Sequence, residues 1–130
     1  MMRQKGLLTA TFIGPEEIEF RHPDMITNML RGILGVQFLH GGGDPLFFIA
    51  YSTDAPNCPM AVVIDGKQQY PEIRMHGKVQ TVEPIYINQL VSADDVMAVE
   101  VYARGGNMPI SLQVDDSRCG VIALWTGSRR

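Results

Sequence analysis

Short apolar runs of strand length, separated by turns, recur along this chain. Residues 7–13 carry β-branched and aromatic side chains that suit a pleated surface. Residues 60–64 form a compact apolar run that stops at the turn dipeptide Asp65–Gly66. Two further apolar runs, 98–102 and 121–125, lie near the C-terminus. The pattern predicts a strand at each of these places, and the last of them closes the sheet.

Less regular segments lie between the strong runs. Residues 36–39 and 46–51 are predicted strands, whereas residues 52–57 are polar and predict a loop. Residues 83–87 are a further candidate strand, confined to an edge or a strand start because their proline has no N–H to donate. Such an edge could pair with another chain, so the sequence leaves homo-oligomerisation open. Residues 67–80 have no clean period and receive no assignment.

Short helices are predicted between and beside the strands. Residues 15–20 begin with a proline, which fits the first helical position, and two glutamates follow where the helix dipole favours negative charge. Asp24 precedes a second helix that ends near residues 32–35, and its apolar stripe consists of Met25, Ile26, Met29, Leu30 and Ile33. Ser92 and Asp95 resemble a capping box for a single helical turn. This mixture predicts an α+β fold.

The size and composition of the chain predict one globular domain. Its 130 residues are 45% hydrophobic and 19% charged. A net charge of -3 provides no broad cationic surface for a nucleic-acid partner. No apolar run reaches the roughly 18 residues of a transmembrane helix. The N-terminal apolar stretch leads into charged residues without a small-residue cleavage site, so no intact signal peptide is expected. These residues fit either a mature fragment or a cytoplasmic protein.

Side chains that could carry chemistry are scattered along the chain. The histidines His22, His40 and His76 lie far apart, and no spacing typical of a metal site joins them. The glycine-rich loop 40–45 lacks the Gly-Lys-Ser/Thr of a phosphate-binding loop, and no serine has a nucleophile motif. Histidines at the protein surface are therefore expected, with neither a metal nor a cofactor.

Paired carboxylates and aromatic side chains receive structural roles. Neighbouring carboxylates do not face each other on a helix or strand, and three such pairs are expected to be solvated: Glu16–Glu17, Asp94–Asp95 and Asp115–Asp116. Aromatic side chains in apolar runs are expected to pack in the fold, namely Phe47, Phe48, Tyr102 and Trp125. No catalytic residue is assigned, and the protein is not expected to be an enzyme.

The two cysteines occupy similar places. Cys58 precedes the apolar run 60–64, and Cys119 precedes the run 121–125. If those strands are neighbours, the two thiols could meet, and a bridge would stabilise the fold by about 4 kcal/mol on the chain-entropy account. Two free thiols in a reducing compartment fit the residues equally well.

The C-terminal motifs follow one another in a characteristic order. Residues 99–102 form an apolar strand that contains a glutamate, a glycine loop with Arg104 and Pro109 follows, and residues 119–126 form the last strand. This order resembles the end of the plug domain of TonB-dependent outer-membrane receptors. That family typically has an Ile-Glu-Val strand, an Arg-Gly-Pro loop and a Gly-Val-Ile strand that closes on threonine.

Upstream motifs agree with the same resemblance. Residues 16–18 and 28–36 are similar to the helix and the strand entrance of the family, although Leu34 stands where proline is usual. Residues 62–66 are similar to its Val-x-Ile-Asp-Gly turn. In the branch of the family with a carboxypeptidase-regulatory-like domain, one cysteine precedes that strand and another precedes the final strand. The resemblance therefore implies a disulfide between Cys58 and Cys119.

The resemblance covers residues 7–126, with flexible termini expected at 1–6 and 127–130. It implies a plug-like fold with a small mixed sheet and two or three short helices. It also implies a non-catalytic gate for substrate uptake in the periplasm or outer membrane, with a β-barrel and a TonB-like energy-coupling protein as partners. A stand-alone soluble binding module with the plug fold is the alternative.

Four departures from the family pattern limit the resemblance. No TonB box is evident before the first strand and no barrel sequence follows Arg130, so a complete transporter is not expected. The loop 108–118 diverges, and residues 68–81 have no counterpart. The sequence therefore names neither a ligand nor a ligand-binding residue.

Overall fold

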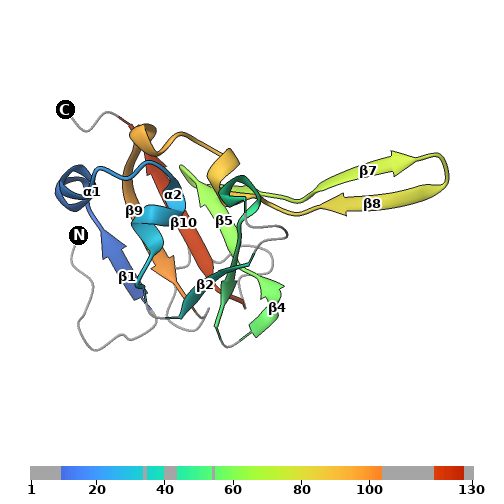
Figure 1. Cartoon of the computed structure of the whole chain (residues 1–130), viewed down its shortest axis with the longest axis horizontal. Helices are drawn as coiled ribbons and strands as arrows, with labels where there is room; N and C mark the ends of the chain where they lie inside the picture. Colours follow the sequence, from blue (N-terminus) through green and yellow to red (C-terminus); the bar gives the residue numbers. More distant parts are fainter. Residues whose placement is uncertain (1–9, 34, 40–43, 54, 104–118, 128–130) are drawn as a thin grey trace.

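A computed structural model describes residues 10–33, 35–39, 44–53, 55–103 and 119–127. Its central sheet has five strands, which are β1 (Ala10–Ile13), β5 (Ala61–Ile64), β6 (Lys67–Gln69), β9 (Val96–Tyr102) and β10 (Val121–Thr126). They lie in the order β1-β9-β10-β5-β6 (Figure 1). β5 and β10 run parallel, and the other neighbouring pairs are antiparallel. The predicted α+β fold with a small mixed sheet is confirmed.

Strand β10 lies in the middle of the sheet because both of its faces are apolar. Ile122 and Leu124 point into the larger core cluster. Val121 and Ala123 point to the opposite face, where they pack with Tyr102. Side chains alternate between the two faces of a strand, so a strand buried on both faces reads as an unbroken apolar run. Each fully buried Ile, Leu or Val side chain contributes roughly 1.5–3 kcal/mol to folding.

Two helices, α1 (Pro15–Arg21) and α2 (Ile26–Leu30), lie over one face of this sheet (Figure 1). Four of their buried side chains join the larger core cluster: Ile18, Ile26, Met29 and Leu30. The second helix is shorter than predicted. Met25 is its N-cap in place of Asp24, and the chain is already extended at Arg31, before the predicted end at residues 32–35. The predicted single turn is present as η3 (Ala93–Asp95), where the Ser92 hydroxyl accepts a hydrogen bond from the Asp94 N–H.

A second sheet has three strands in the order β2-β3-β4, with bounds β2 (Val36–Leu39), β3 (Ile49–Ser52) and β4 (Ala55–Pro59). The strand predicted at 46–51 begins too early, because η1 (Pro45–Phe47) is a 3₁₀ turn capped by the Asp44 carboxylate. The loop predicted at 52–57 is also wrong in part. The second half of that segment belongs to β4, which pairs with β3 at the edge of the sheet. An edge strand does not have to be apolar, so the sequence did not show it.

The strand predicted at 83–87 is wrong. Strand β8 (Val79–Glu83) ends where that segment begins, and a 3₁₀ turn, η2 (Ile87–Gln89), ends it. Pro84 cannot donate a ladder hydrogen bond. The Ile87 N–H instead donates to the carbonyl oxygen of Phe48, 3.1 Å away, and the Ile87 side chain is buried in the core.

The segment left without assignment, residues 67–80, holds β6, β7 (Glu72–His76) and the start of β8. Strands β7 and β8 form a β-hairpin that projects from the body of the protein (Figure 1). Its positions are exposed except for the partly exposed last residue. Ile73 lies opposite Val82, and the guanidinium of Arg74 lies 2.6 Å from the Glu72 carboxylate. The hairpin carries an apolar face and a charged face outside the core.

Candidate functional site

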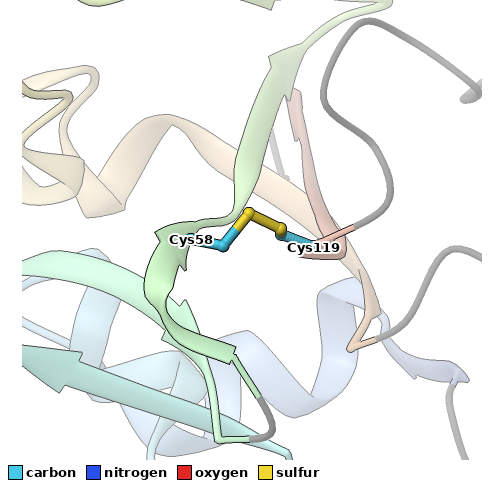
Figure 2. Close-up of a disulfide and its surroundings, with 2 residues drawn as sticks. All are labelled: Cys58 and Cys119. Atoms are coloured by element: carbon cyan, nitrogen blue, oxygen red, sulfur yellow. A yellow bond between two sulfur atoms is a disulfide. The ribbon is translucent and has the colours of Figure 1, made fainter.

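The disulfide joins the starts of the two parallel strands. Cys58 lies at the end of β4, just before β5, and Cys119 lies just before β10 (Figure 2). Their Cα atoms are 5.8 Å apart, although 61 positions separate them in sequence. The register pairs residue 61 with residue 121, so the two strand entrances lie side by side. The bridge therefore fixes the end of the sheet at which both strands begin.

Gly120 makes the close approach at this entrance possible. Its φ is +98°, a left-handed conformation that side chains rarely adopt. A Cβ atom there would lie 2.6 Å from the carbonyl oxygen of Tyr102 and 2.9 Å from Cε of Met60. The Gly120 carbonyl accepts a hydrogen bond from the Ala61 N–H at 3.0 Å. A glycine is required between the bridge and β10.

Asp65 ties the same two strands together at their other end. Its carboxylate accepts hydrogen bonds from both the backbone N–H and the hydroxyl of Thr126. The hydroxyl bond first, and then the backbone bond, hold the pKa of Asp65 below its usual value. Asp65 and Gly66 both have positive φ, as the predicted turn requires. The parallel pair is therefore fastened at both ends.

A buried carboxylate lies on the sheet face opposite the helices. Glu100 is 8% exposed and accepts hydrogen bonds from the Tyr102 hydroxyl at 2.8 Å and from Nε1 of Trp125 at 3.0 Å. These bonds compensate part of the cost of taking a carboxylate out of water. The sequence signal for this cluster is a single acidic residue in an otherwise apolar strand, β9. The predicted packing of Tyr102 and Trp125 is present, but both aromatics also serve as donors.

The other residues considered from sequence do not converge on one place. His22 is exposed at the end of α1, His76 is exposed at the end of β7, and His40 lies outside the described residues. Among the described residues, no group of three potential ligands of the His, Cys, Asp and Glu types is close enough to hold a metal ion. Two carboxylate pairs, at 16–17 and 94–95, are exposed as expected, and the pair at 115–116 lies outside the described residues.

The predicted packing of Phe47 and Phe48 holds for one residue only. Phe48 is buried and stacks near Phe38, with ring centroids 6.2 Å apart. Phe47 is 43% exposed and contacts Tyr86 edge to face. Within the described ranges, no helix is long and apolar enough to cross a membrane.

Part of several known receptors has the same fold as this chain. No protein-family profile and no curated protein sequence matches this chain. Among solved structures, the ferric enterobactin receptor PfeA of Pseudomonas aeruginosa has a TM-score of 0.67 and 19% identity, with 97% of this chain and 18% of that chain covered. The siderophore receptor PirA of Acinetobacter baumannii has a TM-score of 0.65 and 18% identity, with 95% and 18% covered.

A third receptor shows the same likeness. The ferric yersiniabactin uptake receptor FyuA of Yersinia pestis has a TM-score of 0.57 and 16% identity, with 95% of this chain and 17% of that chain covered. This chain spans less than a fifth of the length of these receptors. The plug-domain fold of TonB-dependent receptors, which the sequence motifs imply, is confirmed as the fold of this chain.

Proposed function

We propose that this chain is a non-catalytic plug that gates substrate uptake through an outer-membrane β-barrel, with a TonB-like protein as the energy-coupling partner. The observation that carries the proposal is the likeness in fold over 97% of the chain to a receptor of which the chain spans only 18%. A segment that spans 18% of such a receptor has the size of one domain of a larger transporter.

The fastened strand pair suits such a gate. The disulfide holds β5 and β10 together at one end, and the Asp65 hydrogen bonds hold them together at the other. We therefore expect this pair to stay intact when other parts of the sheet open. Strand β1, in contrast, lies at the sheet edge, outside the loop that the disulfide closes, and pairs only with β9. A pull applied from the N-terminal side would load the four residue pairs of β1 and β9 first. Release of β1 would expose Ile13, which belongs to the larger core cluster, while β5 and β10 stay paired.

Location and conductance test the gating function. Immunoblots of fractionated cells of the native source, with an antibody against this chain, should detect it in the outer-membrane fraction, on a polypeptide or complex much larger than 14.4 kDa. In a planar bilayer, that assembly should conduct poorly with the plug and freely after its removal. A freely soluble species of 14.4 kDa, or equal conductance with and without the plug, would contradict gating.

A stand-alone binding module is the second candidate. The observation that favours it is the projecting hairpin, because exposed apolar side chains grouped on one face often mark an interaction surface. Ile73, Met75 and Val82 are each at least 58% exposed. In this case the immunoblot would find the chain in a soluble fraction, bound to a partner or free.

A further inference from the structure

A pocket lies where the hairpin joins the body of the protein. Its volume is about 280 Å³, and its walls come from β3, β4, β5 and the segments on either side of the hairpin. Four buried members of the larger core cluster line it: Ala50, Met60, Val62 and Ile87. The pocket therefore opens onto the hydrophobic core itself, and its inner surface is apolar.

Proline residues restrict the backbone in the wall of this pocket. Three prolines line it, Pro59, Pro71 and Pro84. Proline has a fixed φ and no N–H, so these residues give the wall a set shape without adding polar groups. Cys58 also lines the pocket, and the disulfide ties this part of the wall to the start of β10. These restraints on the backbone of the wall would reduce the entropy cost of binding.

Two glutamines supply most of the polar character. Gln68 and Gln69 line the pocket, and the Gln69 amide nitrogen donates to the Lys67 carbonyl oxygen at 3.0 Å. This bond holds the amide in place, and its oxygen and second N–H keep hydrogen-bonding capacity. None of the described residues that line the pocket is charged. A metal chelate with net negative charge would find no cation here.

We propose that this pocket binds a neutral, mainly apolar small molecule, or the ring of a larger one, with one or two hydrogen-bonding groups that face the Gln69 amide. A water molecule occupies about 30 Å³ in the liquid, so the pocket has room for roughly ten heavy atoms. Its volume of about 280 Å³ lies just below the range of roughly 300–1,000 Å³ that is usual for small-molecule sites, which suits a small ligand or one ring. The proposal does not depend on gating, since a stand-alone module would have the same pocket.

Indole is a suitable probe, because it is neutral, bicyclic and carries one N–H. Titration of the isotope-labelled chain, followed by amide NMR shifts, should give saturable shifts at residues 68–70 and 85. Indole-2-carboxylate, the anionic analogue, should bind at least fivefold more weakly. Ala50→Leu, which fills the pocket, should weaken indole binding at least fivefold. Ile85→Ala, which removes a half-buried wall residue, provides a second test if the first variant does not fold.

Val79→Ala is the matched control, because Val79 is 62% exposed at the far end of the hairpin and does not line the pocket. It should leave the indole affinity unchanged. The proposal is overturned if the folded wild-type chain gives no saturable shifts, or if the shifts centre on Ile73 and Val82 of the hairpin face. It is also overturned if indole-2-carboxylate binds as tightly as indole, or if the folded pocket variants bind as well as wild type.

Discussion

Removal of the Cys58–Cys119 bridge gives the most direct test of how this fold is held together. The bridge closes a loop of 61 positions, and the chain-entropy relation for that length gives about 4 kcal/mol of stabilisation. The double variant Cys58→Ala, Cys119→Ala should therefore unfold with a free energy lower by about 2–5 kcal/mol. For a domain of this size, such a loss lowers Tm by about 10–20 °C.

Urea denaturation of three samples separates the cross-link from the packing of the sulfur atoms. The samples are oxidised wild type, wild type reduced with a phosphine, and the double alanine variant. The reduced wild type keeps both sulfur atoms, so its loss of stability measures the cross-link alone, and any further loss in the variant measures packing around the buried Cys119. The reductant should not change the variant.

The denaturant slope gives an independent check on the mechanism. A cross-linked unfolded chain is more compact and exposes less surface, so the m-value should rise when the bridge is removed. A loss below about 1 kcal/mol with an unchanged m-value would refute the reasoning. It would mean that the bridge does not restrict the unfolded chain.

Three further substitutions test the contacts around the parallel strands. Because hydrogen bonds from Thr126 lower the pKa of Asp65 in the folded state, their stabilisation is present above the unfolded pKa of about 3.9 and is lost as pH falls through the folded value. A Tm profile from pH 7 to 2 should therefore fall less steeply in Asp65→Asn, and an identical fall would contradict this role. Glu100→Leu should lower the free energy of unfolding by about 1–3 kcal/mol, because it removes the acceptor of the Tyr102 hydroxyl and of the Trp125 indole N–H. It should also shift the emission of the single tryptophan, and an unchanged spectrum and stability would count against the cluster. Gly120→Ala should cost about 3–5 kcal/mol, since its methyl would meet a backbone oxygen at 2.6 Å. Gly77→Ala is the control, because Gly77 also has a positive φ but has open space around it, and it should lower the free energy of unfolding by about 1 kcal/mol. Equal losses of stability for Gly120→Ala and Gly77→Ala in thermal melts would refute the steric argument.

The projecting hairpin carried a sequence signal of its own. Ile73 and Met75 alternate with Glu72 and Arg74, which is the period of a strand, and the turn lies at residues 77–78. The signal is weak because the hairpin packs on nothing, so neither face needs to be uniformly apolar. A short turn without the Asn-Gly or Asp-Gly dipeptide also gives little indication of a hairpin.

Local physics accounts for what the sequence determined by itself. The strands β5, β9 and β10 were predictable because burial on both faces favours an apolar run, which only Glu100 of β9 interrupts. The turn was predictable from the dipeptide Asp65–Gly66, which readily adopts the positive φ values observed there. The start of α1 was predictable from a proline that fits the first helical position. Each of these features depends on a few neighbouring residues and not on the rest of the chain.

Only the tertiary structure decided which distant residues meet. From the residues alone, Cys58 and Cys119 could have been free thiols; the parallel register of β5 and β10 brings them together. The pocket likewise combines residues from 49 to 87, and no local pattern marks its lining. The contacts of Asp65 and Glu100 across strands are of the same kind. Hydrophobic periodicity fixes which face of an element is buried, whereas strand order and register fix what that face contacts.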